Sequence, residues 1–497
     1  MFRIPKWTAV LFLFLLLASA AEASSQQDSG NSTKESISHL QEVGAAQILA
    51  EIEANQAVAF DNVSISGNLD LSKLTGPIRQ QFKITNSTIL EPANFQEVTF
   101  GEHLDLRGTT FRNNVSYAKA QFQGDANFAG TNFSVDTDFR FAKFDRAVSF
   151  GHVRFGGVVS YANAQFDGNT IFEGARFLGD AKFDLVQFSR PVTFMSAVFS
   201  GDTSITNSQF GGTTIFMNSK FNGSVSFAGT RFVSDVIFRS SRFLGGSSFG
   251  LTSFGGFSDF ANVIFDGDAF FPASKFADNA YFIEAEFNQD LDLEDARINS
   301  MQLDNATFGK DSKINLKGAD FTRLAVPWST IKDRLVFNGA AYLALVKNYK
   351  NLERFDDADN CYFQYRQISQ ANEPWGWSKL ADIISWLSCG YGVRVSYTVF
   401  WCIFTILFFG MVFWAGNGMR RFEQIGLEIP GCAEAIQKQR VSLVDALYFS
   451  VAMFTTSQAP VNNYPVGVYR HLAMFEGILG WFFLGLFVVV LSGVLIR

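Results

Sequence analysis

The feature that most constrains this chain is a ladder of apolar residues whose spacing alternates between five and six. From Ile84 the apolar positions advance by 5, 6, 5 and 6 residues without a break as far as Ile298. Of these 40 positions, 32 are Phe and every one is apolar. Neither the 3.6-residue period of a helix nor the two-residue alternation of a strand produces this spacing. The ladder therefore predicts a coiled, repetitive architecture.

A small residue often lies two positions before the ladder residue, as Ala126 does before Phe128 and Ala164 before Phe166. A step of five with a small residue at this offset resembles the pentapeptide-repeat family. The resemblance implies a mainly β fold, a right-handed quadrilateral β-solenoid in which each side of a rung points its central Phe inward. The small residue would share that crowded interior.

The alternation also sets the expected dimensions. Two sides of five and two of six residues make a coil of 22, so the ladder predicts about ten coils and a rod of roughly 48 Å. Two buried Phe stabilise an 11-residue unit by roughly 3–6 kcal/mol, whereas ordering its backbone costs about 11 kcal/mol or more. Because no unit is stable alone, stacking must supply a continuous core and shared hydrogen bonds.

The flanks of the ladder predict caps. Before it, residues 44–55 favour a helix and residues 59–71 alternate like a first strand. After it, residues 315–321 form one more repeat fragment, and residues 339–352 and 356–368 favour a pair of amphipathic helices. That pair resembles the helical hairpins that often follow such solenoids.

Both ends of the chain predict a membrane-directed protein. Residues 1–23 combine Arg3 and Lys6 with an apolar stretch and a small-x-small cleavage site, which is typical of a secretory signal peptide. An uncleaved signal anchor is the alternative, and in either case the next domain is expected to be exported. Residues 395–414 carry no charge, and residues 472–496 carry only Glu476. Each run is long enough to cross a hydrocarbon core of about 30 Å.

Composition disfavours several function classes. A net charge of −7 argues against a nucleic-acid-binding surface. The four Cys form no CxxC pair and the four His are scattered, so no metal site is predicted. The chain has no phosphate-binding loop, HExxH motif or nucleophile elbow, and we expect no catalytic residue, no enzyme activity and no cofactor.

The segment between the two apolar runs carries the functional signal. Residues 442–454 predict an amphipathic helix too short to span, and a Thr-Thr loop and a Tyr-Pro-Val sequence follow it. This order resembles the two-transmembrane pore module of potassium-channel-like proteins over residues 395–496. The resemblance implies a homotetramer around a pore lined by loop carbonyls and Thr oxygens, with a monovalent cation, potassium among the candidates, as the permeant ion.

The resemblance also assigns roles to individual residues. The selectivity-filter region would comprise Thr455, Thr456, Ser457, Gln458, Ala459 and Pro460. The pore-loop exit would comprise Tyr464, Pro465 and Val466. The inner helix would bend at Gly477, Gly480 or Gly485, for which close helix packing is the alternative.

One departure affects selectivity. The potassium filter has Thr-Val-Gly-Tyr-Gly-Asp, whereas this chain continues from Thr456 with Ser-Gln-Ala-Pro-Val. Both Gly that turn carbonyls inward are missing, Pro460 restricts Ala459, and the loop has no acidic residue. A weakly selective cation pore and a poorly conducting, degenerate pore therefore both stay open. The Gly-Tyr-Gly within residues 389–393 precedes the first span without a pore helix and is not expected to be a filter.

Two further expectations concern the membrane. Residues 375–387 contain three Trp and predict an interfacial helix that could pass movements of the solenoid to the pore. An exported solenoid places the loop between the spans in the cytoplasm, which is inverted relative to potassium channels and similar to glutamate-receptor channels. Five cations in that loop, against two just before the first span, agree with this orientation. These five are Arg420, Arg421, Lys438, Arg440 and Arg470.

The sequence therefore predicts five segments. They are a signal peptide (1–23), an N-terminal linker and helix (24–58), the solenoid (59–325), a helical linker with an interfacial helix (326–394) and a two-helix pore domain (395–497). The expected function is a membrane ion channel whose exported solenoid is a sensor or docking domain for an unknown partner. The alternative is a membrane-anchored scaffold with a non-conducting pore module.

Overall fold

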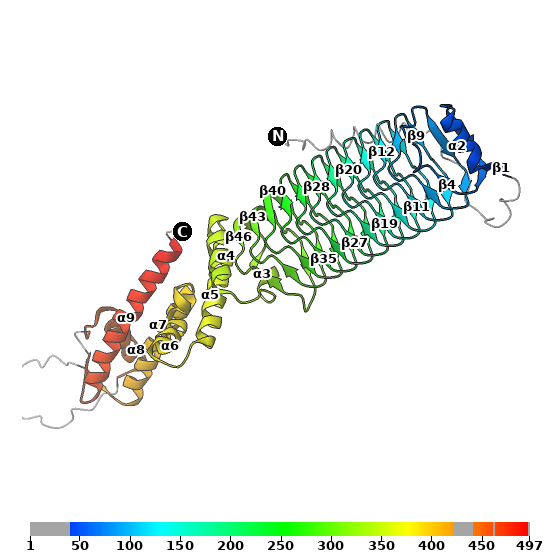
Figure 1. Ribbon diagram of the computed structural model, residues 1–497. Helices are drawn as coiled ribbons and strands as arrows, with labels where there is room; N and C mark the ends of the chain where they lie inside the picture. Colours follow the sequence, from blue (N-terminus) through cyan, green and yellow to red (C-terminus); the bar gives the residue numbers. More distant parts are fainter. Residues whose placement is uncertain (1–39, 422–440, 461–462, 496–497) are drawn as a thin grey trace, which may run out of the picture.

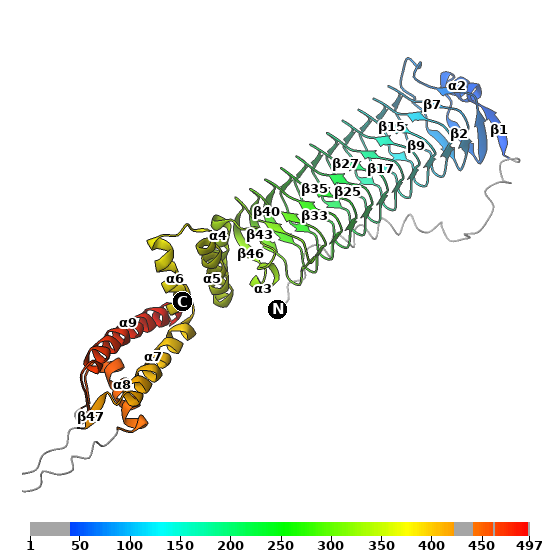
Figure 2. The same ribbon diagram turned by 90° about the horizontal axis from the view of Figure 1, so that it is seen from below.

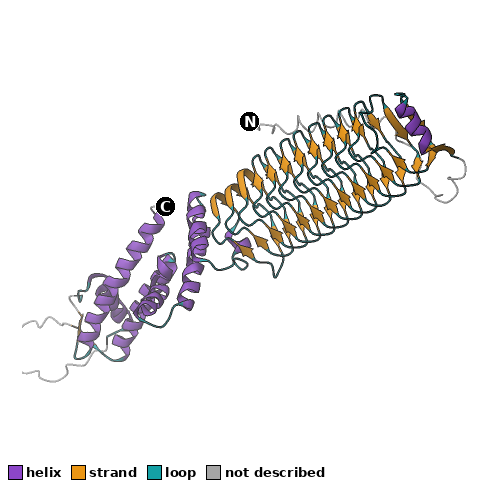
Figure 3. Cartoon of the chain, in the orientation of Figure 1, coloured by secondary structure: helices purple, strands orange, loops and turns teal. Residues whose placement is uncertain are grey.

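The chain forms a long β-solenoid followed by a series of helices (Figure 1). The computed structural model describes residues 40–421, 441–460 and 463–495. The predicted signal peptide lies outside these residues. Strands make up the rod, and helices lie at both of its ends (Figure 3).

Each coil in the central part of the solenoid has four two-residue strands. One coil consists of β10 (Thr110–Phe111), β11 (Val115–Ser116), β12 (Gln121–Phe122) and β13 (Ala126–Asn127). β14 (Asn132–Phe133) then pairs in parallel with β10, so that each residue faces the one 22 positions later. The quadrilateral coil of 22 residues is thus confirmed.

The rod is longer than the ladder alone predicts. The sheet on one face holds 13 strands, so the solenoid has about 13 turns where the ladder predicted about ten. The additional turns come from the flanking segments. The predicted single strand at 59–71 is wrong, since this segment forms β2 (Val58–Asp61), β3 (Val63–Ser66) and β4 (Leu69–Asp70). Left-handed residues at Asn62 and Gly67 turn the chain between these strands.

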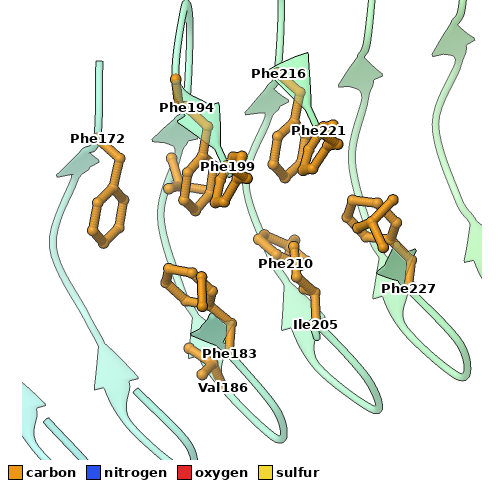
Figure 4. Close-up of a cluster of buried hydrophobic side chains, with 14 of the residues drawn as sticks. Phe172, Phe183, Val186, Phe194, Phe199, Ile205, Phe210, Phe216, Phe221 and Phe227 are labelled. Atoms are coloured by element: carbon orange, nitrogen blue, oxygen red, sulfur yellow. The ribbon is translucent and has the colours of Figure 1, made fainter. Parts of the chain in front are cut away.

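Aromatic columns fill the interior. All 40 ladder residues are buried, each at most 3% exposed, and rings from successive coils stack with centroids 4.4–5.5 Å apart. Phe172, Phe194 and Phe216 form part of one such column (Figure 4). Rings of neighbouring columns meet edge to face, as Phe172 and Phe183 do at 5.7 Å. These stacked and T-shaped arrangements are the favourable geometries for aromatic pairs.

The two step lengths correspond to two kinds of corner. Every five-residue step contains a left-handed residue two positions after its ladder residue, and these residues recur every 11 positions from Asn86 to Asp295. The left-handed conformation turns the chain sharply, so five residues suffice. The other corner has only ordinary backbone angles and uses one residue more. Several of these left-handed positions are occupied by residues other than glycine, among them Leu185 and Leu251, and the left-handed conformation is strained for such residues.

Both ends of the rod are covered, which protects the edge strands from pairing with other chains. At the N-terminal end, β1 (Gln41–Gly44) pairs with β3, and α2 (Ala45–Glu53) buries Ile48 against the core. The helix predicted at 44–55 is thus confirmed (Figure 2).

At the C-terminal end, β46 (Asp320–Ala325) is followed by α3 (Trp328–Ile331), α4 (Gly339–Asn351) and α5 (Phe355–Asn372). The predicted pair of helices is thus confirmed. The buried Asn348 amide on α4 accepts a hydrogen bond from Leu324 N at 2.9 Å and donates one to Leu324 O at 2.8 Å. Asn348 therefore completes the hydrogen bonding of the last strand as another coil would.

Beyond α5, the described residues form further helices and one pair of short antiparallel strands. The helices are α6 (Trp377–Cys389), the short η3 (Gly390–Gly392), α7 (Val395–Ala415), α8 (Leu443–Thr456) and α9 (Tyr469–Leu495). The strands are β47 (Met419–Arg421), directly after α7, and β48 (Asn463–Pro465), between α8 and α9. α7 leads away from the solenoid and α9 returns toward it, with α8 between them (Figures 1 and 2). The described residues that follow α7 (416–421) and those that precede α9 (463–468) therefore lie at the end of the module far from the solenoid.

Candidate functional site

The candidate site is the three-helix module of α7, α8 and α9. Two of its helices, Val395–Ala415 and Tyr469–Gly493, are long and apolar enough to cross a membrane by length and composition. The 14 residues of α8 span only about 21 Å. Ser442 caps α8 by accepting a hydrogen bond from Asp445 N at 3.1 Å, and the Asp445 carboxylate lies in the first turn, where it suits the helix dipole.

The three helices share a small aromatic core. Phe409 and Phe413 of α7 pack with Phe449 of α8 and Ala473 of α9, and the Phe413 and Phe449 rings meet edge to face at 5.2 Å. The helices also approach one another closely. A Cβ atom at Gly410 would lie 2.6 Å from the Leu447 side chain. The backbone of α7 at Gly410 therefore packs directly against the Leu447 side chain of α8.

The predicted filter residues lie at and after the C-terminal end of α8. Thr455 and Thr456 occupy its last turn, and their hydroxyls donate to Val451 O and Ala452 O of the same helix, each at 2.7 Å. Ser457 ends the helix in the left-handed conformation, with φ of 57°. This group is solvent-exposed in the single chain, as are Gln458 and Ala459, and Pro460 is half-buried.

The Tyr-Pro-Val sequence forms a strand that returns to α7. Tyr464 and Pro465 belong to β48, which pairs antiparallel with β47 directly after α7. Val466 N donates to Gly418 O at 2.9 Å, which extends this pairing. The structure thus ties the exit of the predicted pore loop to the end of the first apolar helix.

The three candidate hinge glycines occupy different environments. A Cβ atom at Gly480 would lie 2.0 Å from Phe454 O, and one at Gly477 would lie 2.9 Å from Ser457 Oγ. Both glycines therefore let α9 approach the end of α8. A Cβ atom at Gly485 would meet nothing within 4 Å. Close packing accounts for Gly477 and Gly480, and Gly485 is the hinge candidate with free space around it.

One buried polar contact in the module was not anticipated from the sequence. Glu476 of α9 is completely buried, and its carboxyl oxygen Oε1 contacts Ser450 Oγ of α8. Ser450 Oγ also lies 2.8 Å from Ile406 O of α7. Glu476 was noted only as the single charge in an apolar run. Its four-residue spacing from Gly480 was the available signal that it shares the face of α9 that packs against α8.

The predicted interfacial helix is α6. Trp375 and Trp377 at its start are 79% and 88% exposed, and Lys379 lies over the Trp375 ring at 5.1 Å. The Gly-Tyr-Gly sequence forms η3, a tight connection between α6 and α7 remote from the pore-loop candidates. Its position before α7 agrees with the prediction that it is not a filter.

Charged side chains join this connection to the helices that cap the solenoid. Arg366 of α5 donates to Asp382 of α6 at 2.5 Å, and its guanidinium lies 5.2 Å from the centre of the Tyr391 ring in η3. Arg394, just before α7, donates to Asn360 of α5 at 2.6 Å. The last helix on the rod is therefore bonded to both α6 and the start of α7.

Comparison with known proteins supports only the solenoid. The family described as pentapeptide repeats (9 copies) matches residues 84–132 and, in overlapping stretches, 161–208, 183–231 and 205–253. No curated protein and no solved structure matches the chain. The matched residues lie on the five-six ladder and carry its buried columns. The rod of this chain is therefore a parallel β-solenoid built from pentapeptide repeats, followed by helices of which two could cross a membrane.

Proposed function

We propose that the protein is a membrane ion channel, a homotetrameric cation pore whose exported pentapeptide-repeat solenoid is a sensor or docking domain. The permeant ion would be a monovalent cation. The proposal rests on the module of α7, α8 and α9.

The observation that carries the proposal is the re-entrant course of the chain through α8. This helix is too short to cross a bilayer, packs between the two longer helices, and ends in the non-helical segment from Ser457 to Pro460. Non-helical backbone at membrane depth requires a protein or water-filled surrounding, because lipid offers it no hydrogen bonds. A water-filled pore between subunits would provide that surrounding.

The exposed side of α8 supports oligomerisation. Val444, Tyr448 and Val451 are 74%, 63% and 42% exposed in the single chain and recur at helical spacing on one face. Thr455 continues this face toward the loop. The opposite face of α8 already contacts α7 and α9, so a second copy of the module is the natural cover for these side chains.

The loop chemistry favours weak selectivity. Potassium filters rely on two glycines that turn carbonyls toward the ion, and the segment after Thr456 has none. Thr455 and Thr456 donate their hydroxyl protons to their own helix. Thr456 Oγ1 also accepts from Gln458 N at 3.3 Å, and each hydroxyl oxygen keeps at least one lone pair as an acceptor for a cation. A partly hydrated monovalent cation suits such a lining better than a fully dehydrated one.

The proposed orientation places the solenoid outside the cell and the loop region inside. The ends of α7 and α9 nearest the solenoid lie on the same side of the module (Figure 2), so the paired strands β47 and β48 lie on the other side. Arg420 of β47 and Arg470 in the first turn of α9 lie at that other end and are exposed. Protease applied to right-side-out vesicles should digest the solenoid, and an intact solenoid would contradict this orientation.

A membrane-anchored scaffold is the second candidate function. The replacement of the filter glycines by Gln458, Ala459 and Pro460 favours it, because a rigid loop without glycine can hold subunits together without conducting. In this case the solenoid would remain exported and the module would only oligomerise it.

Ion flux separates the two candidates. The full chain, reconstituted in liposomes, is expected to pass K⁺ and Na⁺ down imposed gradients. Thr456→Val, which replaces a hydroxyl by a methyl group, should change the ratio of K⁺ to Na⁺ flux. Ser492→Ala is the matched control, since the Ser492 hydroxyl donates to Val489 O of its own helix at 2.8 Å. Absence of flux from an intact, cross-linkable tetramer would leave the scaffold.

A further inference from the structure

The buried carboxyl of Glu476 has a hydrogen-bonding environment that restricts its protonation state. Ser450 Oγ contacts both Glu476 Oε1 and the backbone oxygen of Ile406, the latter at 2.8 Å. A hydroxyl group has a single proton to donate, and a backbone carbonyl can only accept. If Ser450 donates to Ile406 O, its contact with Glu476 requires a proton on the carboxyl group.

We infer that Glu476 is a protonated, neutral positioning residue that donates to Ser450 Oγ, while Ser450 donates to Ile406 O. This chain of two hydrogen bonds joins α9 to α8 and α8 to α7 in the middle of the module. The inference deepens the proposed function and rests on it for its role, since α8 ends in the segment from Thr455 to Pro460. Holding α8 in place therefore positions the proposed pore lining.

Two close helix contacts lie one turn beyond these two hydrogen bonds and keep the bonded atoms within reach of each other. Gly410 follows Ile406 by four residues and lets Leu447 approach α7. Gly480 follows Glu476 by four residues and lets the backbone of Phe454 approach α9. Each contact brings two helices closer than a side chain with a Cβ atom would allow, so the polar groups one turn away can bond directly.

Among the residues that the structure describes, no cation pairs with Glu476, and the charged groups nearest it along the three helices lie more than one turn away. On α7, Cys402 lies one turn before Ile406. On α8, Asp445 lies five residues before Ser450, about 7 Å along the helix. On α9, Arg470 lies six residues before Glu476, about 9 Å along the helix, and donates to Pro465 O at 3.3 Å.

The second oxygen of the carboxyl, Oε2, has no hydrogen-bond partner among the described residues. A buried, unpaired carboxylate is costly in such a setting, whereas a neutral acid needs only the one bond it has. Loss of the proton would break the bond to Ser450 and release α8.

Infrared spectroscopy of the purified full chain tests the proton directly. At neutral pH the wild type should show the C=O band of a protonated carboxyl group that is absent from Glu476→Gln. Ser450→Ala should shift this band, because it removes the hydrogen-bond acceptor. A wild-type spectrum with no such band would overturn the inference. This readout does not depend on flux, so a clear band in a non-conducting protein would remove the proposed function and leave the proton in place.

Flux tests the positioning role. Glu476→Gln keeps a donor to Ser450 and should match wild-type flux at neutral pH within about twofold, while Glu476→Leu should lower it about three- to fifteen-fold, the range of one interhelical hydrogen bond. Raising the pH should reduce wild-type flux and leave Glu476→Gln unchanged. Ser492→Ala should follow the wild type throughout. An alkaline loss that persists in Glu476→Gln would overturn the positioning role.

Discussion

Substitution of one ladder Phe by Ala gives a measurable, local prediction for the solenoid. The Phe172 ring stacks on Phe150 and Phe194, each at 4.8 Å, and meets Tyr161 and Phe183 edge to face at 5.6 and 5.7 Å. Replacing a buried Phe by Ala typically costs 3–5 kcal/mol. The upper part of that range applies here because these contacts and a fifth, with Phe177 at 6.1 Å, are lost and the neighbouring coils hold the cavity open.

The expected effect is confined to the adjacent coils. Stability in a solenoid is a sum of unit and nearest-neighbour terms, so we expect Phe172→Ala to lower local protection without unfolding the distant coils. A loss of 3–5 kcal/mol corresponds to about a hundred- to a few-thousand-fold faster amide exchange. Hydrogen exchange followed by mass spectrometry should place this change in residues 150–194.

A surface substitution in the same coil is the control. Leu178 is 38% exposed, and Leu178→Ala should change exchange by less than about fivefold. If Phe172→Ala accelerates exchange no more than Leu178→Ala, or accelerates it equally along the whole rod, the stacked columns do not stabilise the solenoid as argued. The reverse substitution Ile205→Phe restores an aromatic to the column that runs from Phe183 to Phe227, and should slow local exchange.

Three further predictions concern single residues. Leu251 is 72% exposed and has a left-handed backbone, with φ of 59°. Leu251→Gly should therefore stabilise its coil by about 1 kcal/mol, measured by local hydrogen exchange. Leu244→Gly, at a corner with ordinary backbone angles, should not stabilise the coil. Asn348→Ala removes both side-chain bonds to Leu324 and should cost about 2–4 kcal/mol, seen as earlier melting of the C-terminal coils; unchanged melting would refute the capping role. Burial and the nearby Asp357 carboxylate raise the pKa of the Cys361 thiol to about 12, so iodoacetamide should not label it from pH 7 to pH 9 in the native protein, and labelling at native pH would contradict its burial.

The solenoid was predictable because its signal repeats. Every 11-residue unit places an apolar residue at the same two positions, and 20 repetitions of one pattern outweigh any local ambiguity. The first coil was misread as a single strand because residues 59–71 alternate like one. Only the backbone angles at Asn62 and Gly67 show that the chain turns there. The last coil's cap at Asn348 could not be foreseen, since one buried amide in a helix has no distinctive spacing.

The candidate site was predictable as an order of helices and less so in its contacts. The extents of α7, α8 and α9 follow from largely apolar runs, of which α7 has no charge and α8 and α9 carry only one or two. The direction of the Thr455 and Thr456 hydroxyls, and the contact between Glu476 and Ser450, depend on how three helices pack. Periodicity within one helix determines which residues share a face, but it does not determine which neighbouring helix that face meets.

Along the ladder, each paired residue lies opposite the one 22 positions later, so this part of the rod can change length only in fixed increments. Removing 22 residues would shorten it by one coil, about 4.8 Å, and would deliver α4 to the same face as before. Removing 11 residues would rotate the attachment point of the helices by half a turn and place Asn348 on the wrong side of the last strand. The distance between the N-terminal cap and the module of α7, α8 and α9 can therefore change in whole coils while their relative orientation is kept.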